Sequence, residues 1–189
     1  MKIKNLVLAV IILLTGNVMF AQKMEVNTEK SSIEWHGEKI GGEHEGTIEV
    51  KSGYLELKNN KIVAGDFVID MTTITNTDLK DEGYNQKLVG HLKSDDFFGV
   101  EKYPTANLEI TKSSKFSNGK ATVTGNLTIK DKTESVSFEV LEKGKTYTAK
   151  MEIDRSKFDV RYGSDSFFDN LGDKAIDDIF TLNIKLLVD

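Results

Sequence analysis

The sequence has 189 residues, with 25 basic and 30 acidic side chains, a formal net charge of −5 and no cysteine. The acidic excess disfavours binding to nucleic acid or to anionic membranes, and the lack of cysteine excludes disulfides, thiolate chemistry and lipidation on an N-terminal cysteine. A chain of this length suits one domain that is stabilised by an ordinary hydrophobic core.

The first 21 residues have the layout of a signal peptide. Two lysines precede an apolar run over residues 6–14, which ends well short of the roughly 20 residues that a membrane-spanning helix needs. We therefore expect cleavage after Ala21, export to the periplasm or secretion, and one folded domain over residues 22–189. An uncleaved membrane anchor is the alternative. No integral membrane segment is expected after processing, because no second apolar segment exists.

Alternation of apolar and polar residues dominates the rest of the chain and predicts half-buried strands. A slip in this alternation near Gly65 indicates a bulge. The Asn118-Gly119 pair is a strong hairpin signal. The alternating segments, about eight strands in all, cover residues 33–35, 46–57, 62–71, 106–110, 121–129, 136–140, 147–153 and 180–188.

One helix is predicted over residues 83–93. Tyr84, Leu88 and Leu92 fall four residues apart on one face, and an aspartate just before them can cap the first turn. A second short helix or turn is expected near residues 171–178. One helix among hairpin-linked strands predicts an all-β, antiparallel barrel of about eight strands, with the helix across an opening.

The connection after this helix reads HLKSDDFFGVEKYPTANLEI over residues 91–110. Pro104 requires the helix to end earlier and a strand to begin close behind it. Phe97 and Phe98 should fold inward, because exposing two rings to water is unfavourable. They either anchor the connection to the core or face an apolar ligand. The similar run SDSFFDN at 164–170 is expected to use the same solution.

The polar candidates are few. Arg155 and Arg161, the only arginines, could contact a carboxylate, a phosphate or a quinone oxygen. Ion pairs with neighbouring aspartates are the alternative. The three histidines, His36, His44 and His91, are too dispersed for a metal site to be expected.

No catalytic residues are expected. The acidic pairs Asp95-Asp96 and Asp177-Asp178 are typical of solvated turns or capping groups, although paired carboxylates can also act in catalysis. The sequence carries no G-x-S-x-G nucleophile motif and no glycine-rich phosphate loop. We therefore expect a protein that is not an enzyme.

Three runs resemble the YceI-like family of polyisoprenoid-binding proteins: HLKSDDFFGVEKYPTA at 91–106, GNLTIKDKTESVSFEV at 125–140 and IDRSKFDVRYG at 153–163. The segment SIEWHGEKIGGEHEGTIEV at 32–50 fits the opening strands of that family. The similarity spans nearly all of residues 24–188. It implies a lipocalin-like barrel that is exported to the periplasm and holds a long isoprenoid, or a similar lipid, in its interior.

An eight-stranded barrel either fills with side chains or keeps room for one small ligand. Small residues at presumed inward positions would leave space, or would serve close backbone packing instead; they are Gly46, Ala64, Ala106, Ala121, Gly125 and Ala149. Both readings stay open on the sequence alone.

The function hypothesis is a binding or carrier protein for a polyisoprenoid or isoprenoid-quinone-like lipid, with no cofactor beyond that lipid. The alternatives are an envelope enzyme that acts on an apolar substrate and a filled-barrel scaffold or interaction protein. A homodimer is also left open. The candidate ligand contacts are Trp35, Phe67, Ile69, Leu88, Leu92, Phe97, Phe98, Leu108, Ile110, Val123, Leu127, Phe138, Met151, Arg155 and Phe167.

Overall fold

The computed structural model describes residues 21–189, so the predicted signal peptide lies almost entirely outside the described residues. The strands are β1 (Gln22–Glu25), β2 (Ser32–Lys39), β3 (Gly42–Leu57), β4 (Ile62–Asp70), β5 (Thr105–Ser113), β6 (Lys120–Ile129), β7 (Lys132–Lys143), β8 (Thr146–Asp154) and β9 (Ile176–Leu187), and the α-helix is α1 (Glu82–Lys93). Single 3₁₀ turns occupy Thr28–Lys30, Met71–Thr73, Arg155–Phe158 and Gly172–Lys174. Among the described residues, no helix has both the length and the apolar composition needed to cross a bilayer.

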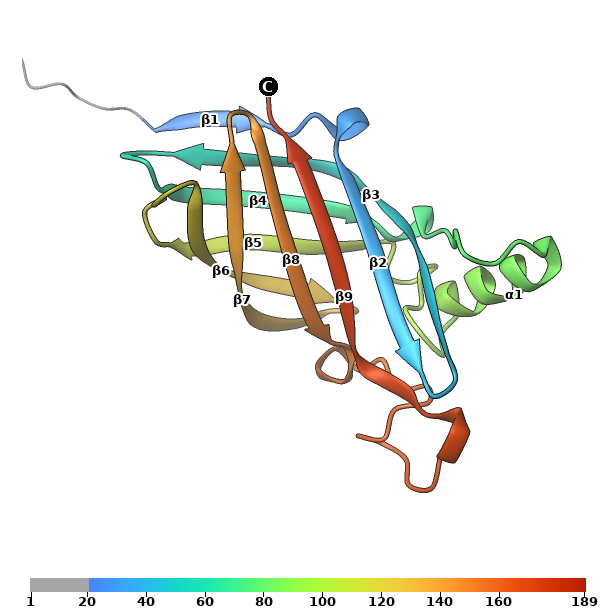
Figure 1. The fold of residues 1–189 in the computed structure, drawn as a ribbon. Coiled ribbons are helices and arrows are strands. Elements are labelled where there is room, and N and C mark those ends of the chain that lie inside the picture. The colour runs from blue at the N-terminus through green and yellow to red at the C-terminus, as the bar shows by residue number, and fades with distance from the viewer. Residues whose placement is uncertain (1–20) are drawn as a thin grey trace, which may run out of the picture.

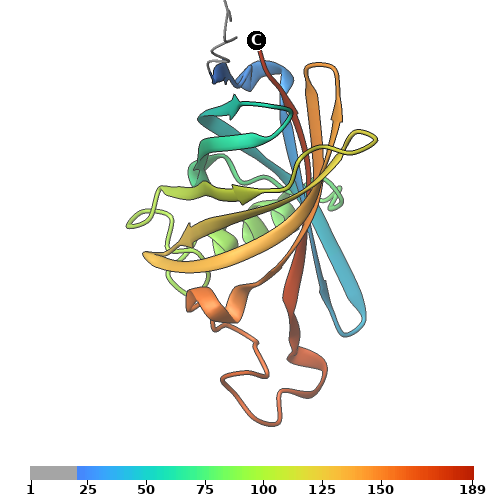
Figure 2. The same cartoon turned by 90° about the vertical axis from the view of Figure 1, so that its left-hand side faces the viewer.

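Eight strands form a closed antiparallel barrel (Figures 1 and 2). Around the ring the order is β3, β2, β9, β8, β7, β6, β5 and β4, and pairing between β3 and β4 closes it. The long β3 makes this possible, because its first half pairs with β2 and its second half with β4. The short β1 lies along the second half of β3, on the side that β2 leaves free. The predicted all-β barrel of about eight strands with one helix is confirmed.

The turns follow the sequence signals. Asn118 and Gly119 have φ angles of 51° and 75°, as a tight hairpin between right-twisted strands requires. The β6–β7 turn uses Lys130 and Asp131 at φ angles of 48° and 58°, which shows that a left-handed turn forms here without glycine. Strand β5 starts at Thr105, directly after the proline, as predicted.

The predicted bulge lies in β4, two residues before Gly65. Glu56 of β3 pairs with Ala64, whereas the next residue, Leu57, pairs with Ile62. Val63 is therefore the extra residue of a β-bulge. Because the bulge shifts the phase, Gly65 is buried, while Ala64 is only half-buried, contrary to the expectation that Ala64 points inward.

Among neighbouring strands of the barrel, β7 and β8 share the fewest backbone residue pairs. These strands pair only through Val140–Lys143 and Thr146–Ala149. Beyond that point β7 pairs only with β6, and β8 pairs only with β9. A depression follows the line where they separate, with Ser137, Phe138 and Lys150 among its lining residues. We call this region the β7–β8 seam.

Helix α1 lies beside one opening of the barrel (Figure 1). Its N-terminus is capped by Asp81, whose side chain accepts a hydrogen bond from the Tyr84 N–H at 2.9 Å. Leu92 is buried and Leu88 is half-buried, but Tyr84 is 65% exposed. The apolar stripe that meets the barrel is thus shorter than predicted, because Tyr84 lies one turn beyond the barrel contact.

Candidate ligand-binding cavity

An apolar cavity of about 190 Å³ occupies the half of the barrel next to α1. Strands contribute its walls, and α1 with the following connection contributes its cover. Nearly all of its inner surface is formed by apolar atoms, although six of the lining residues are polar or charged. The lining residues are Ile33, Trp35, Gly37, Glu38, Lys39, His44, Ile48, Ile69, Met71, Ile74, Leu88, His91, Leu92, Phe97, Phe98, Ala106, Leu127, Ile129, Arg155, Ile176, Asp177, Phe180 and Leu182. The barrel is therefore hollow in this half.

The other half of the barrel is filled by side chains. Phe116 and Tyr147 are buried there with their ring centroids 6.2 Å apart. The Tyr147 hydroxyl donates to Glu142 Oε1 at 3.0 Å, which satisfies its polar atom. Val123, with no exposed surface, and Leu55 also belong to this core. Sequence alone left open a hollow or a filled barrel, and the structure combines both.

An aromatic corner closes one side of the cavity. The Phe97 ring makes edge contacts with His91 and Phe98, at centroid distances of 5.5 and 5.6 Å. Lys130 Nζ donates to the Phe97 carbonyl oxygen at 2.9 Å and fixes the backbone at this point. Phe98 contacts Phe180 of β9, 6.5 Å away. Both predicted rings thus fold inward, and both anchor the connection while also facing the cavity.

The second aromatic pair behaves differently. Phe167 and Phe168 are 39% and 49% exposed and line no part of the cavity. The expectation that this run repeats the arrangement of Phe97 and Phe98 is wrong. Its loop projects past the end of the barrel, where no strand or helix of residues 21–189 covers it (Figure 2).

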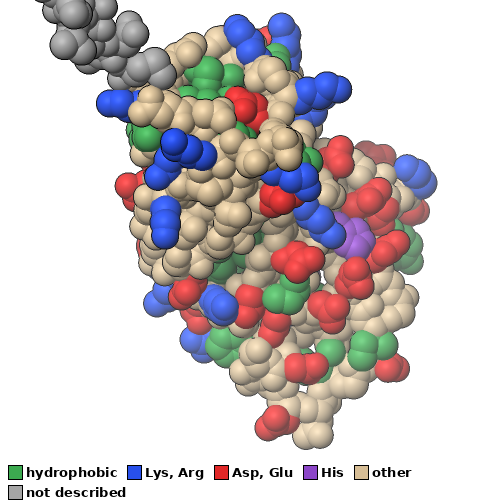
Figure 3. Space-filling model, turned by 60° about the vertical axis from the view of Figure 1, so that its left-hand side comes forward, with side chains coloured by type: hydrophobic (Ala, Val, Ile, Leu, Met, Phe, Trp, Pro, Cys, Tyr) green, Lys and Arg blue, Asp and Glu red, His purple; other side chains and the backbone are tan. Residues whose placement is uncertain are grey.

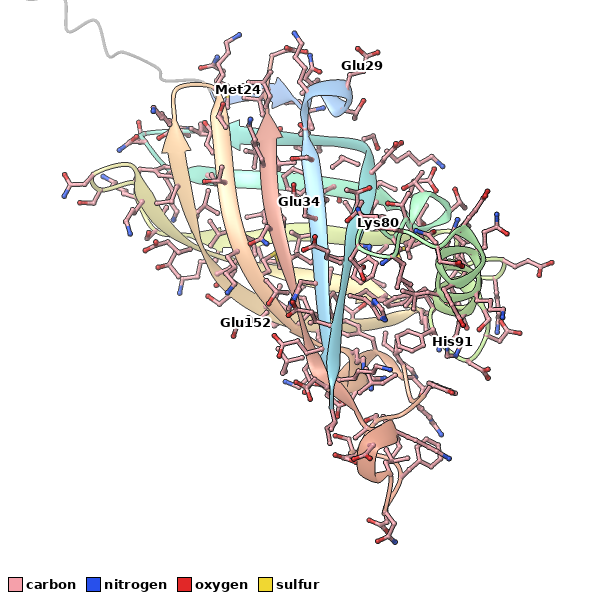
Figure 4. All side chains as sticks on the ribbon, turned by 45° about the vertical axis from the view of Figure 1, so that its right-hand side comes forward. Met24, Glu29, Glu34, Lys80, His91 and Glu152 are labelled. Atoms are coloured by element: carbon pink, nitrogen blue, oxygen red, sulfur yellow. The ribbon has the colours of Figure 1, made fainter. Side chains whose placement is uncertain are left out.

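Polar side chains from two elements line the cavity: Glu38, Lys39 and His44 come from the β2–β3 hairpin, and His91, labelled in Figure 4, comes from α1. We call the side of the cavity that these residues line its mouth. His44 Nδ1 lies 2.9 Å from Asp78 Oδ2. Burial opposes ionisation of Asp78, but hydrogen bonds from the Glu45 N–H, from His44 and from Asn76 outweigh it and lower the pKa of Asp78 to about 2. Asp78 is therefore an anion that orients the His44 ring.

The Arg155 guanidinium makes hydrogen bonds to the backbone that hold the local structure together. Its side chain is 2% exposed and donates to the carbonyl oxygens of Val160, Tyr162, Ile176 and Asp177 at 2.8–3.0 Å. Nη2 also lies 3.3 Å from an oxygen of Asp178, an ionic contact that lacks hydrogen-bond geometry. Burial lowers the pKa of Arg155, while the nearby aspartates oppose that shift. Arg155 thus clamps two chain segments together, because four of its five N–H groups donate to backbone carbonyl oxygens.

The structure separates the candidate ligand contacts into two groups. Those that line the cavity are Trp35, Ile69, Leu88, Leu92, Phe97, Phe98, Leu127 and Arg155. Those that lie elsewhere are Phe67, Ile110, Val123 and Met151, which are buried outside the lining, Leu108 and Phe138, which are half-buried, and the exposed Phe167. Alternation identifies the inward face of each strand but not the half of the barrel that the face reaches.

Several lining residues were absent from the sequence-based set. Phe180 and Leu182 belong to an alternating strand whose inward face was already evident. Met71 ends the predicted alternation over residues 62–71 but was not among the candidate contacts, and Ile74 lies beyond that alternation. His44 and His91 were weighed as metal ligands and were not expected at the cavity; their place at the mouth follows from strand register and helix placement.

The small residues serve different purposes. A Cβ atom on Gly46 would lie 2.0 Å from the Thr75 carbonyl oxygen, and one on Gly125 would lie 2.7 Å from that of Glu109. These glycines therefore permit close backbone packing. Ala106 instead lines the cavity, where its small side chain leaves space.

One group of side chains could contact a cation. His36, Glu38 and Glu43 place one possible ligand atom each within 4.8 Å of one another near the β2–β3 turn. His36 Nε2 lies 3.2 Å from Glu43 Oε2, and both glutamates are largely exposed. In the described residues this is the one such group, and a protonated His36 can itself bridge the two carboxylates.

Solved structures share this barrel. BcnA from Burkholderia cenocepacia is 25% identical with a TM-score of 0.66, over 85% of this chain and 98% of that chain. A polyisoprenoid-binding domain from Saccharophagus degradans is 11% identical with a TM-score of 0.56, over 88% and 97% of the two chains. The YCEI protein of Campylobacter jejuni is 20% identical with a TM-score of 0.54, over 100% and 91%. The two less identical structures support the fold alone.

No curated protein matches the sequence. A family model described as the YceI-like domain matches residues 24–188, which is nearly all of the described chain. The same span contains the barrel, α1 and the cavity. The chain therefore belongs to the YceI-like family.

Proposed function

We propose that the protein binds a long apolar lipid of the polyisoprenoid type in its barrel, without chemical conversion of that lipid. The observation that carries this proposal is the cavity, whose inner surface is nearly all apolar and whose few polar residues include His44 and His91 at its mouth. Such a site takes up hydrocarbon and leaves a polar end of the ligand near water. The proposed ligand class is the one named for the Saccharophagus degradans structure, which shares this fold and is described as a polyisoprenoid-binding domain.

The cavity size limits how much of the lipid lies inside. An apolar cavity of about 150 Å³ holds a benzene molecule with its six carbons, so 190 Å³ accommodates roughly one to two five-carbon isoprene units. On the same scale the cavity holds about eight carbons, which at about 0.8 kcal/mol each contribute about 6 kcal/mol before entropic costs. The rest of a longer chain must extend through the mouth or widen the barrel.

We also propose that the protein works outside the cytoplasm. The support is the apolar run within the first 21 residues, which has the length of a signal-peptide core rather than of a membrane span. The mass of the protein purified from its host tests this, since processing after Ala21 would leave Gln22 as the first residue. A mass equal to the full 189 residues would contradict it.

Trp35 offers a direct test of lipid binding. It is the only tryptophan in the chain, it lines the cavity, and its Nε1–H donates to the Thr75 carbonyl oxygen at 2.9 Å. Titration with farnesol should shift its fluorescence to saturation, and mass spectrometry of a solvent extract should find a polyprenyl compound in the freshly purified protein. An empty extract together with an unchanged fluorescence spectrum would contradict the proposal.

A further inference from the structure

A loop at one end of the barrel exposes two adjacent phenylalanines, and an exposed isoleucine lies beside the end of that loop. Residues 161–175 project past the barrel, as Figures 1 and 2 show. They carry Phe167 and Phe168, which are 39% and 49% exposed. Ile40, 56% exposed at the β2–β3 turn, lies beside this loop because its N–H donates to the Ala175 carbonyl oxygen at 3.4 Å. We call Ile40, Phe167 and Phe168 the apolar tip.

The loop that carries the tip is firmly built. Arg155 bridges both of its ends through the carbonyl contacts described above, and the Ile176 N–H donates to Gly163 O at 2.8 Å. The N–H groups of Phe167 and Phe168 both donate to Ser164 O at 3.1 Å, and Ser164 is fully buried. The backbone that carries the rings is therefore fixed, and the Arg161 guanidinium lies over the Phe167 ring, 5.0 Å from its centroid. Both rings stay partly exposed, although turning them inward would remove apolar surface from water.

Ile40, at one end of the tip, lies next to the cavity mouth. Lys39 and Ile176 form a cross-strand pair, and both line the cavity. Each is adjacent in sequence to a residue of the contact between Ile40 and Ala175. A surface that receives the tip would thus also face the opening through which a ligand enters.

The tip is too small for a stable protein partner. Three side chains, each about half exposed, present roughly 300 Å² of apolar surface. A specific protein interface buries about 800 Å² on each partner. Insertion into the boundary between lipid head groups and acyl chains needs only a few side chains that reach about 5–10 Å deep.

We propose that the apolar tip docks the protein on the surface of a zwitterionic lipid bilayer, with the cavity mouth turned toward the lipids. The choice of a lipid surface rests in part on the proposed function, because a lipid carrier must collect or deliver its ligand at a membrane. Adjacent exposed aromatic rings beside a lipid-sized opening serve both steps.

The charge around the tip determines the kind of bilayer. Residues 161–178 contain five acidic and two basic side chains, a balance of −3. Figure 3 shows acidic side chains gathered toward this end of the molecule, with apolar ones among them. Such a charge is repelled by anionic lipids, so the tip favours a neutral surface. The acidic side chains around the tip also limit how deeply its rings insert into the bilayer, because charged groups stay in water.

The expected strength suits a transient contact. Each ring is about half exposed, so its transfer into lipid should raise the partition coefficient about tenfold. Two rings together give a factor of about one hundred. A lipid carrier that must dissociate quickly from the bilayer needs a membrane affinity of this moderate size.

Vesicle flotation tests the proposal with the protein as the host cell produces it. The wild type should float with phosphatidylcholine vesicles, and the double variant Phe167→Ser with Phe168→Ser should lose about one hundredfold in partitioning. Tyr84→Ser is the matched control, because Tyr84 is an exposed aromatic residue on α1, outside the tip. It should bind as the wild type does.

The outcomes separate docking from lipid binding. A wild type that stays with the soluble fraction, or a double variant that floats equally well, would overturn the docking proposal. Stronger flotation with vesicles that contain phosphatidylglycerol would overturn the choice of a neutral surface. Solvent extracts of the same samples report on the cavity independently, so a lipid found in a protein that does not float leaves the proposed function standing. Thermal unfolding of each variant confirms that the fold is intact.

Discussion

Filling the cavity should stabilise the protein and abolish lipid binding at the same time. Ala106 on β5 is 4% exposed and lines the cavity, so Ala106→Leu sends three additional carbons into the hollow. An unfilled cavity destabilises by about 24 cal/mol per Å³, which for 190 Å³ is about 4.6 kcal/mol. Three buried carbons at about 0.8 kcal/mol each recover about 2 kcal/mol of this.

The same substitution in the filled half gives the matched control. Ala121 on β6 is 3% exposed and lies outside the cavity lining. Ala121→Leu should therefore overpack the core and destabilise it by about 1–3 kcal/mol. Both variants are compared by urea unfolding after the lipid has been removed, and their lipid content is measured by mass spectrometry of solvent extracts.

The two variants must differ in sign for the reasoning to hold. If Ala106→Leu lowers the free energy of unfolding as much as Ala121→Leu does, the hollow does not exist in solution. If it stabilises the protein yet retains lipid at the wild-type level, the lipid lies somewhere other than this cavity. Either result would refute the assignment of the cavity as the binding site.

Further predictions concern stability. The lowered pKa of Asp78 contributes about 2 kcal/mol that is fully present above the unfolded-state pKa of 3.8 and is lost as pH falls through about 2. Asp78→Asn should thus lower the free energy of unfolding at neutral pH by about that amount, and the difference from the wild type should vanish in strong acid; a difference that persists there would contradict this. Gly46→Ala should cost about 3 kcal/mol or more in urea unfolding, because the new Cβ meets the Thr75 backbone, whereas Gly37→Ala, with nothing within 4 Å, should change little. Arg155→Met should cost about 3–5 kcal/mol by leaving buried carbonyls without donors, and limited proteolysis should cut residues 161–175 faster; an unchanged cleavage rate would argue against the clamp.

The barrel could be predicted from sequence because its evidence is local. Two-residue alternation, the Asn118-Gly119 turn and the proline before Thr105 each specify a short stretch of backbone, and the closed sheet follows from their number. The bulge near Gly65 was visible as a break in the same alternation. The family resemblance and the residue patterns agreed at this level.

The cavity could be predicted only in part, because it depends on contacts between distant residues. Phe97 and Phe167 stand in similar local sequences, yet one ring is buried and the other is exposed. The difference is what surrounds each connection: α1 and β9 cover the first, while the second projects past the sheet. The sequence likewise does not indicate that the Arg155 side chain donates to four backbone carbonyl groups, because these carbonyls come from two separate segments of the chain.

The β7–β8 seam is the place where the barrel can widen most easily. Strands β7 and β8 share four residue pairs, whereas β6 and β7 share ten, so widening the wall at the seam breaks few backbone hydrogen bonds. A barrel that could not widen, with a cavity for one or two isoprene units, would exclude most of a long polyisoprenoid chain. A barrel that opens only between β7 and β8 can widen to take in more of a hydrocarbon chain and close again after the chain leaves. The other strands keep their pairing register during this change.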